Sequence, residues 1–182
     1  MTERQLLQRL WKLLDTADIV IAHNGDSFDI RKINARMIVH KLPPPSPYRT
    51  IDTKKYAKSV AYFDSNSLNN LCTDMGIGEK MKHRGFDMWE GCLAGKRRDW
   101  ADMKRYNKRD VDLLEKVYLR LRQWVQTKQG RSDGQTCPKC HSARIQFRGT
   151  CTSGLKIMRK IRCNQCTGWS MVSMPKQKVM HH

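Results

Sequence analysis

The chain contains 182 residues, of which 39% are hydrophobic, and its 35 Lys and Arg against 17 Asp and Glu give it a net charge of +18. This length is enough for one core of about 100–150 residues and a small second module. No apolar run is long enough for a transmembrane helix, and the start of the chain lacks the basic and then apolar plan of a secretory signal, so we expect a cytoplasmic protein without a membrane partner.

A helix and a strand are predicted at the start of the chain. Thr2 and Gln5 have the spacing of a capping box, and the leucines that follow recur at helical spacing as far as Leu14. The run 18–22 is apolar and rich in β-branched residues. Such a run is typical of a strand that is buried on both faces of a sheet.

The next elements are shorter. A helix is predicted to begin around Asp29 and to end before the proline run at 43–47. The run 50–53 predicts a second short strand that leads into a helix, and a further helix is predicted over 67–75. From there to about Gly95 we expect irregular structure.

The longest helix is predicted over 99–125, where apolar residues recur every three or four positions. On this helix Tyr106 and Asp110 are one turn apart, so their side chains share a face. Helices that alternate with short strands predict an α/β domain.

Two C-x-x-C pairs, with 22 residues between them, predict a structural metal site in the last quarter of the chain. The four cysteines are Cys137, Cys140, Cys163 and Cys166. Four thiolates satisfy the closed tetrahedral shell of structural Zn²⁺, and in a reducing compartment such pairs indicate a metal rather than disulfides. Apolar and basic residues alternate between the pairs, which predicts a β-hairpin and hence a small zinc ribbon. His141 is an alternative ligand.

The positive charge is concentrated near the end of the chain and predicts an anionic partner. No acidic residue follows Asp133, and Phe147 and Trp169 are candidates for stacking on bases. DNA or RNA is the usual partner of such a surface. The alternative is a solvated surface that only keeps the protein soluble. The basic residues of this segment are Lys139, Arg144, Arg148, Lys156, Arg159, Lys160, Arg162, Lys176 and Lys178.

These patterns divide the chain into two domains. The first is predicted over 1–126 and the zinc ribbon over 137–174. The segment 127–136 is polar, contains two glycines and has no apolar periodicity, which is typical of a linker. The remainder, 175–182, is a basic tail.

Two motifs of the first domain resemble those of a known family. The motifs are H-N-G-D-S-F-D at 23–29 and Y-N-K-R-D at 106–110. They resemble the second and third motifs of the DEDD 3′–5′ exonucleases, and the tyrosine is similar to that of the DEDDy branch. The resemblance covers about 1–125, including 51–53 and 89–95, and extends to predicted ribonuclease H-like exonucleases of phages and bacteria with a terminal zinc ribbon. It implies a ribonuclease H-like fold and the cytoplasm of a bacterium or of a phage-infected host.

The resemblance also implies roles for five residues. Asp29 and Asp110 would be ligands of catalytic Mg²⁺ or Mn²⁺, because hard cations take oxygen ligands. Tyr106 would orient the attacking water, and Asn24 and Phe28 would hold the terminal nucleotide. Three of the five have a structural alternative, because Asp29 can cap a helix, Asp110 can pair with a Lys or Arg, and Tyr106 can belong to the core. We expect His23 to be a structural histidine and Asp52 to cap a helix.

The first motif of that family, Asp-x-Glu on a central strand, has no counterpart among the 17 acidic residues. We therefore expect a partial ribonuclease H-like domain that lacks its N-terminal strands, with an unpaired edge and an uncovered face at 18–22. The missing strands would come from a second polypeptide, from another copy of the chain or from a longer reading frame. Alone, the chain is expected to be inactive or weakly active. The alternative is a non-catalytic nucleic-acid-binding or adaptor protein on this scaffold.

Overall fold

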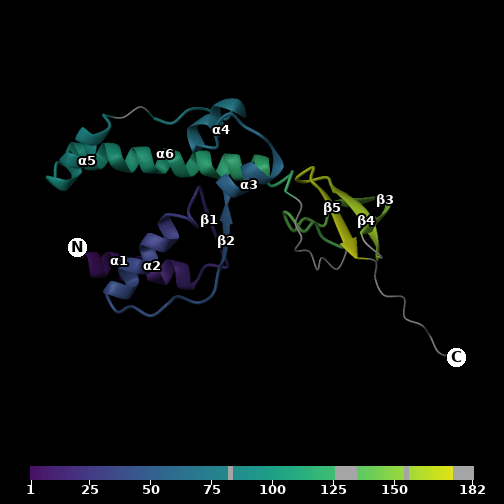
Figure 1. The fold of residues 1–182 in the computed structure, drawn as a ribbon, viewed down its shortest axis with the longest axis horizontal. Helices are drawn as coiled ribbons and strands as arrows, with labels where there is room; N and C mark the ends of the chain where they lie inside the picture. The colour runs from purple at the N-terminus through teal and green to yellow at the C-terminus, as the bar shows by residue number, and fades with distance from the viewer. Residues whose placement is uncertain (82–83, 126–134, 154–155, 174–182) are drawn as a thin grey trace. The chain divides into compact units, whose positions relative to one another are not determined.

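The structure is a computed structural model that describes residues 1–81, 84–125, 135–153 and 156–173 (Figure 1). The chain forms two compact units, Met1–Tyr118 and Leu119–His182. The predicted tail, 175–182, and most of the predicted linker lie outside the described residues. No described helix combines the length and the apolar character that crossing a membrane requires.

The first unit begins with two helices packed on a small parallel sheet. Its elements are α1 (Glu3–Asp15), β1 (Ile19–Ala22), α2 (Asp29–Val39) and β2 (Arg49–Asp52). β1 and β2 pair in parallel, with Ile21 opposite Ile51. α1 and α2 bury Leu7, Leu14 and Met37, and Val20 of β1 packs against this cluster. The predicted capping box at the start of α1 is confirmed.

The opposite side of β1 is open. Ile19 and Ile21 alternate with Val20, and their side chains are 42% and 36% exposed. The prediction that this strand is buried on both faces is therefore wrong for the described structure. The physical reason is that β2 is the one strand with which β1 pairs among the described residues, and α1 and α2 cover only the side of Val20. The expected uncovered face is present.

The rest of the first unit is helical. It contains α3 (Thr53–Val60), α4 (Leu68–Asp74), α5 (Phe86–Leu93) and α6 (Arg97–Leu121). The expectation of irregular structure as far as Gly95 is wrong, because α5 forms there. α5 has no side-chain cap, and its Gly91 leaves room for the buried carboxylate of Asp99, which is paired with Arg84.

The buried stripe of α6 agrees only in part with the predicted periodicity. Leu113, Val117 and Leu121 are buried, whereas Trp100 is 47% exposed. Tyr106 and Asp110 are half-buried and extend the buried stripe toward the start of the helix. The predicted α/β class is confirmed by the mixture of parallel strands and helices.

The second unit contains a three-stranded antiparallel sheet. Its strands are β3 (Ile145–Ser153), β4 (Lys156–Cys163) and β5 (Trp169–Ser173), in the order β3-β4-β5. The predicted hairpin is formed by β3 and β4, and its connecting residues 154–155 lie outside the described residues. Four cysteines and Ile145 form one cluster of buried residues in this unit.

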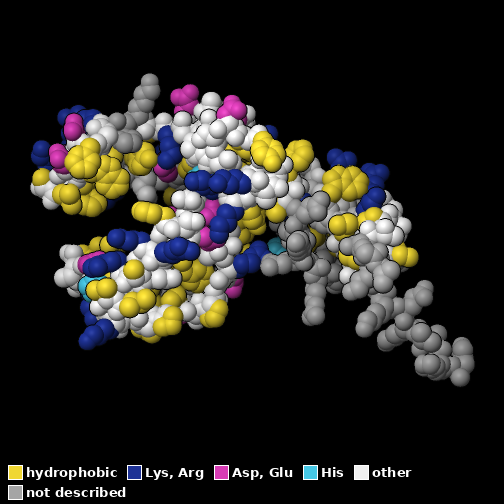
Figure 2. All heavy atoms as spheres, viewed as in Figure 1, with side chains coloured by type: hydrophobic (Ala, Val, Ile, Leu, Met, Phe, Trp, Pro, Cys, Tyr) yellow, Lys and Arg dark blue, Asp and Glu magenta, His cyan; other side chains and the backbone are white. Residues whose placement is uncertain are grey.

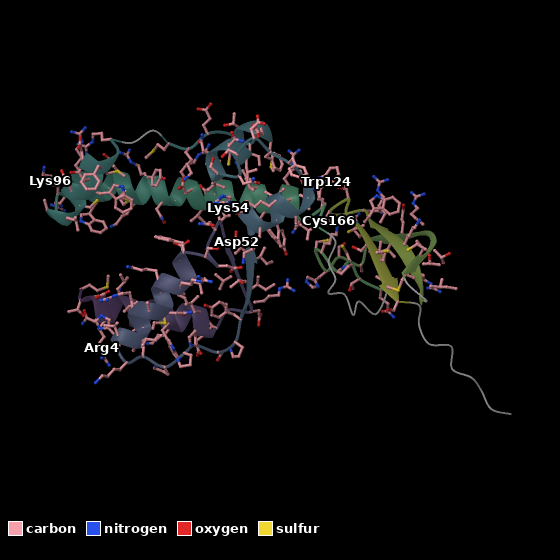
Figure 3. All side chains as sticks on the ribbon, viewed as in Figure 1. Arg4, Asp52, Lys54, Lys96, Trp124 and Cys166 are labelled. Atoms are coloured by element: carbon pink, nitrogen blue, oxygen red, sulfur yellow. The ribbon has the colours of Figure 1, made fainter. Side chains whose placement is uncertain are left out.

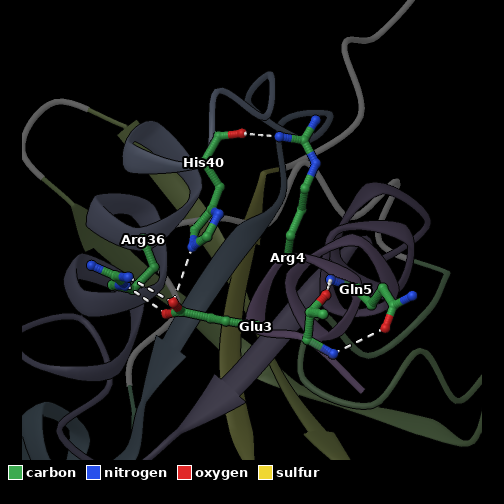
Figure 4. A network of polar contacts seen from close by, with 6 residues as sticks. Glu3, Arg4, Gln5, Arg36 and His40 are labelled. Atoms are coloured by element: carbon green, nitrogen blue, oxygen red, sulfur yellow. Dashed lines mark hydrogen bonds and ion pairs between the residues drawn. The ribbon is translucent and has the colours of Figure 1, made fainter.

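A network of charged side chains connects the start of α1 with the end of α2 (Figure 4). Glu3 accepts hydrogen bonds from Arg36 at 2.6 and 2.7 Å and lies 3.0 Å from Nε2 of His40. Arg4 donates to the backbone oxygen of His40. The bonds from Arg36 and then His40 lower the pKa of Glu3 to about 2.

This network predicts a pH dependence of stability. A carboxylate whose pKa is lowered on folding stabilises the protein fully above its unfolded pKa of about 4.5 and loses that contribution as the pH falls toward about 2. Glu3→Gln should therefore lower the midpoint of thermal unfolding at pH 6, and the difference from wild type should shrink between pH 4.5 and 2.5. Circular dichroism measures it. Glu115→Gln, an exposed control on α6, should show no such pH dependence. A difference in unfolding midpoint between Glu3→Gln and wild type that is equal at pH 6 and pH 2.5 would contradict the prediction.

Candidate functional site

The four predicted zinc ligands come together. Their sulfur atoms all lie within 4.8 Å of one another, with Cys137 and Cys166 3.7 Å apart and Cys140 and Cys163 3.6 Å apart. Tetrahedral Zn–S bonds of about 2.3 Å require sulfur separations of about 3.8 Å, so the donor set and its spacing fit one zinc ion. His141 is not part of this group. Figure 3 labels Cys166 within the second unit.

Backbone amides surround the sulfurs. Lys139 donates to the sulfur of Cys137, and Gln165 and Cys166 donate to that of Cys163 at 3.3 and 3.5 Å. Burial raises the pKa of the Cys163 thiol, but these amides and the neighbouring thiols outweigh burial and bring it down to about 7. Such amide-to-sulfur bonds favour the thiolate, which is the form that binds a metal, but at Cys137, Cys140 and Cys166 burial dominates and raises the pKa.

A second cluster forms on α6. The ammonium group of Lys80 lies 2.6 Å from Oδ2 of Asp110 and donates to the hydroxyl of Tyr106 at 3.2 Å. The same ammonium lies 5.4 Å from the centre of the Tyr106 ring. Tyr106 and Asp110 thus converge on one cation, as their spacing on one helix face predicts.

Lys80 is held in place from both ends. Its backbone N–H donates to the side chain of Asn69 in α4, and Gly78 lies against Arg109 and Leu113 of α6. Burial lowers the pKa of Lys80, but the bonds to Asp110 and Tyr106 outweigh it, so the net shift is upward. The lysine is therefore charged at neutral pH. Sequence reasoning missed Lys80, because it belongs to a loop with no motif or periodicity.

The structural alternative for Asp110, an ion pair with a basic residue, is what the structure shows. This ion pair leaves Oδ1 of Asp110 buried and without a hydrogen-bond partner among the described residues. A buried carboxylate oxygen without a donor costs free energy unless a cation or another donor reaches it. Asp110 can therefore offer this oxygen to a metal ion.

The other predicted motif lies at the end of β1. Asn24 has a φ of 64°, and a Cβ at Gly25 would overlap Ala22, so this Asn-Gly turn is required by the backbone. Phe28 is 65% exposed. Asp29 is exposed in the first turn of α2, and the N-cap position belongs to Phe28, so Asp29 does not cap the helix.

Two further predictions at this edge are confirmed. Asp52 caps α3, with Oδ1 accepting from the backbone N–H groups of Asn24, Lys54 and Lys55 at 2.9, 3.0 and 3.4 Å. Figure 3 shows Asp52 and Lys54 where β2 passes into α3. His23 lies 2.9 Å from the hydroxyl of Thr53 and 3.0 Å from the Asn66 carbonyl, and burial lowers its pKa. It is a satisfied, neutral histidine.

The carboxylates fit a divalent ion only in part. Asp110 offers one buried oxygen, and Asp29 is exposed. Within the described parts of the chain, the four cysteines are the one group of three or more Cys, His, Asp or Glu whose ligand atoms lie together. Two Mg²⁺ or Mn²⁺ ions need more oxygen ligands than these two aspartates supply.

Comparison with known proteins identifies the first unit. No curated protein and no solved structure matches the chain. Residues 1–122 match a family described as the RNase_H superfamily. The match includes both aspartate motifs and Lys80 and ends before the cysteine site, and this superfamily is one of nucleases that process nucleic acids. With more than half of its length matched, the chain belongs to the RNase H superfamily.

Proposed function

We propose that the chain is the metal-dependent part of a 3′–5′ exonuclease of the DEDDy type that acts on DNA or RNA. The observation that carries the proposal is the convergence of Tyr106 and Asp110 on one cation, the ammonium of Lys80. A carboxylate and a phenol that hold one positive charge supply oxygen atoms of the kind that a divalent ion prefers. Membership of the RNase H superfamily supports the same chemistry.

The proposed roles follow from the side-chain chemistry. Asp110, through its buried Oδ1, and Asp29 would be metal ligands, and the metal would offset the charge that develops on the phosphate. The hydroxyl of Tyr106 is within hydrogen-bond distance of the Lys80 ammonium, which pairs with Asp110, and it would orient the attacking water. Exposed Phe28 would stack on the terminal base, and Asn24 would form a hydrogen bond to the same nucleotide near Asp29.

The missing carboxylates belong, on this proposal, to a strand along β1. Among the described residues β1 pairs only with β2, so its other edge is open to an added strand, and exposed Ile19 and Ile21 form an apolar surface beside that edge. A strand with Asp-x-Glu at that edge would lie beside the Asn24 turn. A second polypeptide, another copy or a longer form of this chain would supply it.

The second unit is proposed to be a zinc ribbon that holds nucleic acid. The four sulfurs match the spacing of tetrahedral zinc, and the segment after Asp133 contains basic but no acidic residues. Figure 2 shows Lys and Arg side chains next to hydrophobic ones on this unit. Even two negative charges from the zinc site leave it strongly positive.

A second function, a non-catalytic nucleic-acid-binding or adaptor protein, is favoured by one observation. Lys80 already neutralises Asp110, which is the role that a metal would have in an enzyme. A protein that keeps this pair needs no metal for its fold. The nuclease assay below separates the two functions.

Digestion of labelled oligonucleotides tests the enzyme. With Mn²⁺ and a polypeptide that carries Asp-x-Glu, the chain should shorten strands from their 3′ ends. Asp110→Asn removes a charged metal ligand and should lower the rate by at least about 100-fold, which corresponds to a loss of about 3 kcal/mol of transition-state stabilisation. Asp112→Asn is the matched control and should retain activity, because Asp112 is an exposed aspartate on the same helix as Asp110. Equal inactivity of wild type and Asp110→Asn with every partner would favour the binding protein.

Metal binding tests the role of Lys80. A divalent ion on Oδ1 of Asp110 would be repelled by the ammonium of Lys80, which pairs with Oδ2 of the same carboxylate. Lys80→Gln should therefore raise the affinity for Mn²⁺ by about threefold to tenfold, which corresponds to about 1 kcal/mol. Free Mn²⁺ is measured by electron paramagnetic resonance with zinc-loaded protein. Lys104→Gln, at an exposed position of α6, should change nothing. Identical affinities for wild type and Lys80→Gln would show that Lys80 does not compete with metal.

Zinc analysis tests the cysteine site. The purified protein should contain one zinc ion per chain, and Cys163→Ser should lose it together with the β-sheet signal of the second unit, because so small a sheet depends on its metal. Cys151→Ser is the control, since Cys151 lies in β3 but outside the cluster. Retention of zinc by Cys163→Ser would disprove the ligand set.

A further inference from the structure

The sheet of the second unit has two faces of opposite character, and the strand register assigns each residue to one of them. Neighbouring residues along a strand point to opposite faces, and residues paired across antiparallel strands share a face. Ile161 pairs with Phe147 on one side and with Ser170 on the other, whereas Arg162 pairs with Gln146 and Trp169. These two rows therefore lie on opposite faces.

The face of Ile161 is the buried one near the cysteine site. Ile161, Val172 and Cys163 lie on it, and each is at most 1% exposed. Phe147 lies on this face as well, and the guanidinium of Arg159 lies 5.3 Å from the centre of its ring. One side of the Phe147 ring is therefore occupied by a protein side chain, although the residue is 53% exposed.

The opposite face carries an exposed tryptophan among basic residues. We call it the tryptophan face and define it by Gln146, Lys160, Arg162, Trp169 and Met171. All five are exposed, Trp169 by 51% and Met171 by 45%. Trp169 pairs with Arg162, and Met171 pairs with Lys160, so each apolar side chain has a cation directly across the strand, about 5 Å away.

A third cation reaches the same row. Arg148 donates from its guanidinium to Oε1 of Gln146 at 2.8 Å, and Gln146 is the cross-strand partner of Arg162. Lys160 and Arg162 alternate on β4, which places them about 6–7 Å apart on one face. The row of three charges thus borders an aromatic surface, and the segment after Asp133 has no acidic residue to neutralise it.

We propose that the tryptophan face binds single-stranded nucleic acid, with one base stacked on Trp169 and the backbone phosphates held by Arg162, Lys160 and Arg148. The inference rests on the proposed function only for the class of ligand. Complementarity of charge selects an anionic partner, and an exposed indole among the cations selects one with unstacked rings. A duplex keeps its bases stacked inside and offers none to Trp169.

The proposal distinguishes the two exposed aromatic residues of the sheet. Trp169 should contribute to binding, whereas Phe147, on the other face and beneath Arg159, should not. This difference gives an internal control, because both are aromatic residues of the same sheet with nearly equal exposure.

Fluorescence anisotropy with full-length, zinc-loaded protein and no added Mg²⁺ or Mn²⁺ provides the test. The probes are labelled 20-nucleotide single strands, one of oligothymidylate and one of oligouridylate, together with a blunt DNA duplex. Trp169→Ala should weaken binding of the single strands by about fivefold or more, Phe147→Ala by less than about twofold, and Trp169→Phe should retain most of the affinity. Preference for one of the two single strands identifies DNA or RNA as the ligand.

Salt dependence tests the phosphate contacts. Arg162→Gln should reduce the slope of log affinity against log salt concentration by about 0.7, as expected for one contact to a single strand. Arg159→Gln removes the same charge from the other face and should leave the slope unchanged. Zinc content and circular dichroism confirm that each variant is folded.

Three outcomes would overturn the proposal. They are equal losses from Trp169→Ala and Phe147→Ala, no loss from either, and duplex binding as tight as that of the single strands. None of these measurements depends on cleavage. A chain that shows the predicted pattern but stays inactive with every polypeptide that carries Asp-x-Glu would disprove the exonuclease and keep the binding face. A chain that is active with such a polypeptide but lacks the pattern would do the reverse.

Discussion

The carboxylate of Asp52 is the interaction on which the arrangement of the first unit depends. A single oxygen accepts from the backbone of Asn24 at the end of β1 and from the first turn of α3, so one buried group joins two strands and a helix. With Asp52 only 3% exposed, these bonds act in a medium of low dielectric constant, where they are stronger than at the surface. They fix the turn after which Phe28 and Asp29 emerge.

A second charged group, the ammonium of Lys80, determines whether Asp110 is open to a metal ion. The ammonium of Lys80 pairs with Oδ2 of Asp110 and donates to the hydroxyl of Tyr106 without any metal, but it leaves Oδ1 of Asp110 without a partner among the described residues. One oxygen of the carboxylate is therefore already paired. A metal ion on this scaffold would bind beside a protein cation, and the buried Oδ1 of Asp110 is the carboxylate atom that would gain a partner from it.

The sequence predicted what depends on local patterns. Periodicity and capping located α1, α2 and α6, and the Cys-x-x-Cys spacing located the four sulfurs, because each signal is contained within a few residues. α5 was missed, since its support is the contact between Gly91 and Asp99 from the next helix. Lys80 was missed for the same reason, because its position depends on Asn69 and α6 rather than on its neighbours in the chain.

The structure departs from the sequence patterns mainly in which side chains of the strands are buried and which are exposed. The composition of β1 is that of a strand with two buried faces, yet Ile19 and Ile21 are exposed while Val20 is packed. In the second unit the aromatic residues suggested two equivalent stacking groups, and the register assigns them to opposite faces. The two exposures differ in chemistry. Isoleucines beside an unpaired strand edge favour another strand, whereas a tryptophan between cations favours a base and its phosphates, so the two units would recognise different partners.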